Sequence, residues 1–290
     1  MKVAIYQTSP ILLDLKSNLE DVIAKIRQGR EKGAQLIVFP ELALTGYFFG
    51  QRYHEVALRL DSKEIKQLVS ATEGTAAVVG FIEESPSMNF YNSALVMVDG
   101  NILFTYRKLN LPNYGVFEER KYFAPGKQIP VFRLGVVQKA DVFVTIFNSS
   151  QGSMGTEFSN IESWTIINTF YSRIFGIYNI CANRVGEESF RERRAASGIE
   201  ADQTKSEEDS PVLCETTTYR FWGGSEIINP FGHPIAKADL YKQDEIFGEI
   251  SRDLLRQKKI LLPYLRNDDP YFTYRELQRI LHDKSRVDIP

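Results

Sequence analysis

The sequence is organised around one stretch, Val38-Phe39-Pro40-Glu41-Leu42-Ala43-Leu44-Thr45-Gly46-Tyr47. The apolar run from Gln35 to Phe39 predicts a buried strand. Pro40 ends this strand because proline cannot donate to a sheet ladder, and the next residue is the carboxylate Glu41. Active sites of layered α/β proteins lie just past the carboxyl ends of strands. Glu41 therefore lies where a catalytic acid or base is expected, with an ordinary solvated turn as the alternative.

The composition is that of a folded protein. The chain has 290 residues, of which 43% are apolar and 25% charged, which suits one large α/β domain or two small ones. A net charge of −2 gives no reason to expect a nucleic-acid partner. No apolar run approaches the roughly 18 residues of a membrane span, and Met1 leads directly into a strand pattern without a signal peptide. We therefore expect a cytoplasmic protein with no membrane partner.

Cysteine and histidine are scarce. Two cysteines, Cys181 and Cys214, are too few for a disulfide framework. The histidines, His54, His233 and His282, do not have the spacing of metal ligands. We expect no metal ion and no cofactor.

Strand and helix patterns alternate on both sides of the opening stretch. A strand over Val3–Gln7 and a helix over Asn18–Lys32 precede it, and this order predicts parallel strands joined by a right-handed crossover. Asp99-Gly100 is a strong hairpin signal. The further elements that we predict are a helix over Glu55–Ala71, strands over Ala76–Ile82, Tyr91–Val98 and Ile102–Tyr106, strand pattern over Val131–Val137 and up to Ile146, a helix over Asn160–Tyr171, and strands over Ile174–Ile180 and Ile246–Ile250.

A second informative stretch runs from Tyr106 to Gly126 and reads YRKLNLPNYGVFEERKYFAPG. Lys108 ends a predicted strand before a proline-containing loop, so its ammonium can point into the same cleft as Glu41. A lysine is a compact donor that suits a developing oxyanion. Taken alone, an edge-strand lysine that discourages aggregation would be the preferred interpretation.

Together, these two stretches resemble signatures of the carbon–nitrogen hydrolase (nitrilase) superfamily. FPELALTGY is similar to the first signature, and the stretch around Lys108 is similar to the lysine signature. Two later stretches, ANRVG at 182–186 and the Gly-Gly-Ser and Pro-Phe-Gly elements within 223–232, also resemble family patterns. The resemblance covers Lys2 to about Arg266 and implies one α/β domain over 1–290, an α-β-β-α sandwich of two mixed sheets flanked by helices.

The resemblance also implies a chemistry. Family members hydrolyse a non-peptide C–N bond of an amide, carbamoyl or nitrile substrate through a thiol acyl-enzyme. By this resemblance Glu41 is the general base and Lys108 stabilises the oxyanion. Glu119, rather than its neighbour Glu118, is the second glutamate that fixes the geometry.

The chain departs from the family at the nucleophile. The family has a turn with a cysteine and an acid between two strands, whereas here Val131–Val137 runs directly into the next strand pattern. No cysteine precedes Cys181, which we expect to be a buried core residue. The segment 189–219 is an atypical polar insert without periodicity, expected to be a lid, a partner surface or disorder. Within it, Pro211-Val212-Leu213-Cys214-Glu215 is similar to the nucleophile turn, which makes Cys214 the only candidate nucleophile.

Three interpretations stay open at this point. The chain is a thiol hydrolase that uses Cys214, or it is a catalytically inactive relative that keeps the fold for binding or assembly. In the third, the sequence is an altered or rearranged form of an active enzyme. Family tails commonly make dimer contacts, so we expect residues from about 252 to 290 to serve a homodimer or a higher homo-oligomer.

Overall fold

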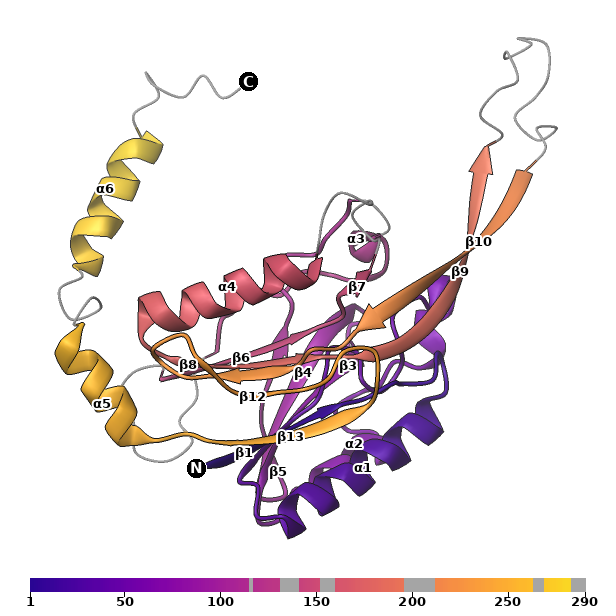
Figure 1. The fold of residues 1–290 in the computed structure, drawn as a ribbon. Helices are drawn as coiled ribbons and strands as arrows, with labels where there is room; N and C mark the ends of the chain where they lie inside the picture. Colours follow the sequence, from indigo (N-terminus) through magenta and orange to yellow (C-terminus); the bar gives the residue numbers. More distant parts are fainter. Residues whose placement is uncertain (115–116, 131–140, 152–159, 196–211, 263–268, 283–290) are drawn as a thin grey trace.

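The computed structural model describes residues 1–114, 117–130, 141–151, 160–195, 212–262 and 269–282. The predicted strand pattern over Val131–Val137 lies outside these residues. Two sheets pack face to face with helices outside them, in the α-β-β-α arrangement that the sequence predicts (Figure 1).

The first sheet has the strand order β13-β1-β2-β3-β4-β5. β1 is parallel to β2 and β2 to β3, while the other neighbours are antiparallel, so the sheet is mixed. Asp99 and Gly100, both with positive φ, form the predicted turn between β4 and β5. The strands are β1 (Lys2–Gln7), β2 (Leu36–Val38), β3 (Ala76–Glu84), β4 (Phe90–Val98), β5 (Asn101–Arg107) and β13 (Asp244–Glu249).

The second sheet has the order β12-β11-β8-β6, and only β6 and β8 are parallel. A third, smaller sheet has the order β7-β10-β9. The strands of these two sheets are β6 (Val142–Phe147), β7 (Ser150–Gln151), β8 (Tyr178–Asn183), β9 (Val185–Ala195), β10 (Val212–Trp222), β11 (Glu226–Ile228) and β12 (Pro234–Lys237).

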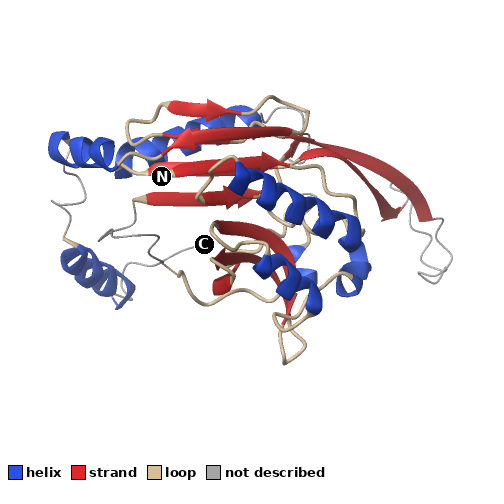
Figure 2. Cartoon of the chain, turned by 90° about the horizontal axis from the view of Figure 1, so that it is seen from below, coloured by secondary structure: helices blue, strands red, loops and turns tan. Residues whose placement is uncertain are grey.

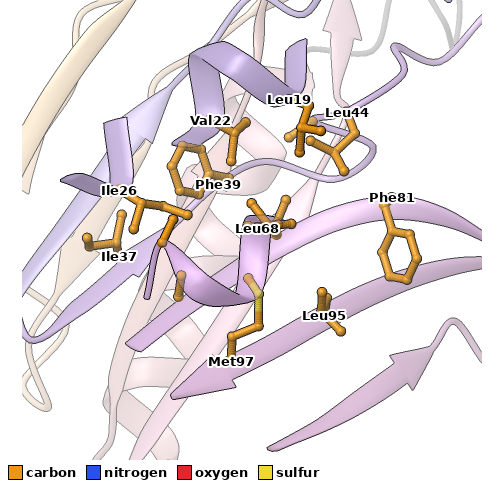
Figure 3. Close-up of a cluster of buried hydrophobic side chains, with 14 of the residues drawn as sticks. Leu19, Val22, Ile26, Ile37, Phe39, Leu44, Leu68, Phe81, Leu95 and Met97 are labelled. Carbon is orange, nitrogen blue, oxygen red and sulfur yellow. The ribbon is translucent and has the colours of Figure 1, made fainter. Parts of the chain in front are cut away.

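Helices cover the outer faces of the sheets (Figure 2). α1 (Leu15–Glu31) begins where the Asp14 side chain accepts a hydrogen bond from Ser17 N, and α2 (Lys63–Ser70) packs beside it. Their apolar faces and the outer face of the first sheet share one core cluster, part of which Figure 3 shows. α4 (Asn160–Phe175) lies over the second sheet. A separate cluster, which includes Val3, Val38, Ile180 and Ile227, fills the space between the sheets.

The predicted helix over Glu55–Ala71 is wrong in its first part. A 3-10 helix, η1 (Gly50–Glu55), comes first, and Leu58 then pairs with β3 through Leu58 N to Ile82 O at 2.9 Å and Glu84 N to Leu58 O at 2.9 Å. The helix begins only after Ser62, whose side chain accepts a hydrogen bond from Ile65 N. Backbone pairing with a neighbouring strand and a capping serine therefore decide where this helix begins.

The polar segment 189–219 contains regular structure that its sequence does not indicate. β9 and β10 pair antiparallel from Val185 opposite Trp222 to Ala195 opposite Val212. We call the outer part of this pair, residues 189–195 and 212–218, the arm, because it extends beyond the rest of the sheets in both views (Figures 1 and 2). Residues 196–211 lie outside the described part of the chain.

The described C-terminal residues form α5 (Arg252–Leu261) and α6 (Pro270–His282). Their predicted role as an oligomer contact stays a prediction. None of the helices that the structure describes is long and apolar enough to cross a membrane.

Candidate active site

Glu41 lies just beyond the end of β2, in a turn packed closely on β3. Gly80 of β3 makes this packing possible, because a Cβ there would lie 2.4 Å from Leu42 N and 2.7 Å from the Cα of Glu41. Leu42 itself has a positive φ of 50°. The turn buries Glu41 to 6% exposure instead of leaving it solvated.

Among the described residues, three groups donate to the Glu41 carboxylate. Asn92 Nδ2 and Lys108 Nζ donate to Oε1 at 2.6 and 2.8 Å, and the backbone N of Asn148 donates to Oε2 at 2.9 Å. Asn148 Nδ2 also donates to the Glu41 carbonyl at 2.9 Å. β4 and the end of β6 therefore hold the turn after β2 from two sides.

Lys108 follows β5 directly and continues its pairing through Lys108 N to Asn92 O at 2.9 Å. Its Nζ donates to Glu41 Oε1 at 2.8 Å and to Glu119 Oε1 at 2.9 Å, so one ammonium bridges two carboxylates. Burial lowers the pKa of Lys108, but Glu41 and Glu119 outweigh burial and raise the pKa above its ordinary value. Lys108 is therefore a permanent cation with one N–H remaining for a ligand.

Glu119 opens the short helix α3 (Glu119–Tyr122), and its backbone N donates to Pro112 O at 3.1 Å. Its Oε1 also accepts from the Tyr47 hydroxyl at 2.7 Å. Burial and the nearby charge of Glu41 raise the pKa of Glu119. Burial, Glu119 and Glu41 likewise raise the pKa of Tyr47, so its phenol keeps its proton and donates. Glu118, by contrast, is exposed and contacts Lys121.

A buried ion pair positions Tyr47. Glu188 of β9 accepts from the backbone N of Tyr47 at 3.0 Å and of Phe48 at 2.8 Å, and it pairs with Arg184. Gly46 has a φ of +77°, and a Cβ there would lie 2.6 Å from Glu188 Oε1. A glycine is thus required for the carboxylate to reach these two N–H groups.

Glu41, Lys108 and Glu119 border a cavity of about 770 Å³, which is large enough for a small organic ligand. Two residues of the lining, Glu119 and Asn148, each carry a buried acceptor, Oε2 and Oδ1 respectively, that has no hydrogen-bond partner among the described residues. The lining residues are Glu41, Tyr47, Lys108, Asn110, Leu111, Pro112, Asn113, Tyr114, Phe117, Glu119, Arg120, Thr145, Ile146, Phe147, Asn148, Ser149, Asn160, Ser163, Trp164 and Ile167.

The structure brings Glu41, Lys108 and Glu119 into direct contact but does not bring the Cys214 backbone to them. Cys214 is the third residue of β10, opposite Arg193 in the arm. It precedes Tyr219, whose ring stacks on Phe48, by five positions in the strand, so its Cα lies about 16 Å farther out than that of Tyr219. No cysteine is found among the described residues that line the cavity.

The other cysteine and two serines near the site were also considered as possible nucleophiles. Cys181 is fully buried in β8, as predicted, and burial raises the pKa of its thiol. Ser149 lines the cavity, and Ser150 begins β7. In the described part of the chain, no cluster of three His, Cys, Asp or Glu side chains could hold a metal ion.

Three residues of the site, Tyr47, Asn92 and Asn148, were not predicted from the sequence. Tyr47 is the last residue of the first signature, which is a signal that could have singled it out. Asn148 follows the last residue of β6, at a strand end like Glu41. Asn92 lies within β4 and gave no signal.

A two-sheet α-β-β-α sandwich with a buried Glu–Lys–Glu set beside a cavity is consistent with the family that the sequence resembles. The family model described as carbon-nitrogen hydrolase matches residues 2–260, and the chain belongs to this family.

Similar proteins include glutamine-dependent NAD(+) synthetases. That of Thermotoga maritima is 38% identical over 141 residues, which are 48% of this chain and 24% of the relative. That of Acinetobacter baylyi is 26% identical over 279 residues, or 89% of this chain and 46% of the relative. The chain thus spans less than half the length of either synthetase. The omega-amidase NIT2-B of Xenopus laevis is 26% identical over 281 residues, 93% of this chain and 95% of the relative.

Solved structures share the fold. A carbon-nitrogen hydrolase from Helicobacter pylori G27 superposes with a TM-score of 0.68 at 20% identity, over 96% of this chain and 97% of that one. The glutamine-dependent NAD+ synthetase of Acinetobacter baumannii superposes with a TM-score of 0.66 at 24% identity, over 88% of this chain and 46% of that one.

Proposed function

We propose that this protein takes the carboxamide group of a small molecule into the cavity at Lys108 and hydrolyses its C–N bond. The observation that carries the proposal is the pattern of donors and acceptors on the wall. Lys108 has an N–H to give, and Glu119 Oε2 and Asn148 Oδ1 lack donors among the described residues. Both acceptors are buried, so the proposal requires their side chains to turn toward the ligand. A carboxamide offers one carbonyl acceptor and two N–H donors, which complements this set.

The same pattern favours a carboxamide over a nitrile. A nitrile has no N–H, so it would leave both buried acceptors without a donor, and a buried polar atom without a partner costs about 1–3 kcal/mol. The named relatives support the carboxamide, since they include glutamine-dependent synthetases and an omega-amidase.

The proposed chemistry uses Glu41 as base and acid and Lys108 at the carbonyl oxygen, while Glu119 holds Lys108 in place. Glu41 takes the proton of a thiol, and the thiolate sulfur attacks the amide carbon as the carbonyl oxygen gains negative charge beside Lys108. The C–N bond then breaks, nitrogen leaves as ammonia with the proton from Glu41, and water releases the acid from the thioester. Cys214 is the proposed source of the thiol, and this requires the arm to bring it to the cavity.

A second candidate function is binding of the carboxamide without hydrolysis. It is favoured by a specific observation: the described wall of the cavity contains no thiol. A reaction of this class cannot proceed without a nucleophile of that kind. The remaining residues would still recognise the amide.

One experiment separates the two functions. Ammonia release from glutamine and from butyramide is measured beside calorimetric binding, for the parent and for Glu41→Gln, Lys108→Ala and Cys214→Ser. Hydrolysis predicts ammonia release that all three substitutions abolish. Binding alone predicts heat without ammonia, lost in Lys108→Ala and kept in Cys214→Ser. No heat and no ammonia with the parent would refute both functions.

We also propose that the chain forms a homodimer or higher homo-oligomer. Large apolar side chains are exposed along α4, namely Ile166, Ile167, Phe170, Tyr171, Ile174 and Phe175. Light scattering after gel filtration would test this, with Phe170→Asp expected to yield monomers. A parent that elutes as a monomer would refute it.

A further inference from the structure

One charged residue of the cavity wall is not used by the proposed chemistry. Among the described residues, four charged side chains line the cavity, and two of them, Glu41 and Glu119, bond to a third, Lys108. The fourth, Arg120, is exposed and makes no ion pair or hydrogen bond with any residue that the structure describes. An arginine carries its positive charge at every physiological pH and offers planar N–H donors that match a carboxylate.

Arg120 lies beside a loop that presents more N–H donors. It follows Glu119 in α3, and the bond from Glu119 N to Pro112 O at 3.1 Å ties this helix to the loop after Lys108. Asn110 and Asn113 of that loop are exposed and also line the cavity. Neither amide side chain is bonded to another described residue. This part of the wall can therefore donate several hydrogen bonds to one anionic group.

The charge balance indicates the sign of the ligand. The two carboxylates and the two cations of the wall cancel when all four are ionised. However, Glu41 and Glu119 are buried and both bond to Lys108, whereas Arg120 is exposed, so the exposed charge that the described wall presents is positive. A cationic group placed there would be repelled by Arg120, whereas an anionic group would be attracted.

We propose that Arg120 binds a carboxylate on the ligand and so determines specificity. The ligand class is then a short dicarboxylic acid with one end converted to a carboxamide: the amide lies at Lys108 and the carboxylate at Arg120. This assignment rests on the proposed function for its amide end, but its carboxylate end stands on the geometry of Arg120 alone.

The test compares three probes that differ by one group. Calorimetry measures binding of the monoamide of glutaric acid, of butyramide, which lacks the carboxylate, and of glutarate, which lacks the amide. We expect the parent to bind the monoamide at least about tenfold more tightly than butyramide. Arg120→Gln should remove this preference without changing butyramide binding, and Arg120→Lys should keep part of it. The matched control is Arg27→Gln, which removes the same charge from the exposed side of α1.

The outcomes distinguish the two proposals. If both amides bind equally, or if Arg120→Gln keeps the preference, the role of Arg120 is refuted while the carboxamide function stands. If only the carboxylate-bearing compounds bind, equally tightly and only with Arg120 present, the carboxylate site stands and the carboxamide function is refuted. If none of the three binds, both are refuted.

Discussion

The Tyr47 hydroxyl donates to Glu119 Oε1 at 2.7 Å, and this bond joins the turn after β2 to the first residue of α3. Lys108 donates to the same oxygen, so the position of its ammonium depends on Tyr47. In the described part of the chain, the Tyr47 hydroxyl has no hydrogen bond to Glu41 or to the three groups that donate to the Glu41 carboxylate. Tyr47 is therefore a positioning residue for the Lys108–Glu119 pair.

Removing that hydroxyl should raise the pKa of Glu119 further, because its hydrogen bond favours the ionised carboxylate. We expect Tyr47→Phe to lose about 1.5–3 kcal/mol of stability, as for a hydrogen bond to a charged group. The binding profile of an amide should also move to higher pH. Chemical denaturation and calorimetry between pH 5 and pH 8 measure both effects, with the highly exposed Tyr271→Phe as the control. An unmoved pH profile would contradict the positioning role.

Ligand binding should weaken as the pH falls. In the proposed binding mode the amide N–H donates to the ionised form of Glu119, and the folded pKa of Glu119 is raised above its ordinary value by burial and by Glu41. Binding should therefore decline as the pH falls through this raised pKa. Glu119→Gln should abolish the dependence, since glutamine does not titrate. A parent whose affinity is constant down to the ordinary carboxylate range would count against this prediction.

The same raised pKa has an opposite consequence for stability. In the window between the ordinary and the raised pKa, the folded chain holds a proton that the unfolded chain has released. The contribution of Glu119 to stability is thus fully present below its unfolded pKa and is lost as the pH rises through its folded pKa. Comparing urea midpoints of the parent and Glu119→Gln across this range measures it. Parallel curves for the two proteins would show that Glu119 has no such effect.

Gly80→Ala should displace the Glu41 turn. The added Cβ would meet backbone atoms of Glu41 and Leu42 below 3.0 Å, and these atoms cannot rotate away. We expect a loss of about 1–3 kcal/mol or more, with weaker amide binding. The control is Gly248→Ala in β13 of the same sheet, where the nearest atoms belong to the side chains of Ile227 and Ile235. Equal stability losses in both variants would contradict the special role of Gly80.

Glu188→Gln should release the Tyr47 turn. It leaves Arg184 charged and buried without its partner, which typically costs about 3–5 kcal/mol. Burial already lowers the pKa of Arg184. Hydrogen exchange of the Tyr47 and Phe48 amides should accelerate. In the double variant Arg184→Met with Glu188→Met, stability should recover in part while the fast exchange stays. Slow exchange in the double variant would mean that Glu188 does not hold the turn.

Thiol labelling tests the nucleophile. Cys181 should label slowly near pH 6, because burial both shields its thiol and raises its pKa. The hydrolysis proposal predicts fast labelling at Cys214, and peptide mass locates the label. Slow labelling at both cysteines would support binding without hydrolysis.

The sequence predicted the fold and singled out three charged residues that lie in contact, Glu41 and Lys108 by their places at strand ends together with the family resemblance, and Glu119 by the resemblance alone. The run before Pro40 and the hairpin at Asp99-Gly100 carry their own structural signals, and Glu41 and Lys108 lie at strand ends. The contact from Asn148 to Glu41 joins residues 107 positions apart, and no local pattern encodes it. The strands of the arm were not predicted, because strands that project beyond the rest of the sheets do not need the apolar alternation of a half-buried strand.

The residues at the base of the arm support the candidate active site. Glu188, the carboxylate that holds the Tyr47 turn, belongs to β9 just before the arm begins. Tyr219, which stacks on Phe48, follows the end of the arm in β10. A truncation that closes β9 onto β10 must therefore keep both residues in register. A deletion that also removed Glu188 or Tyr219 would remove contacts that hold the Tyr47 turn, and Tyr47 in turn donates to Glu119.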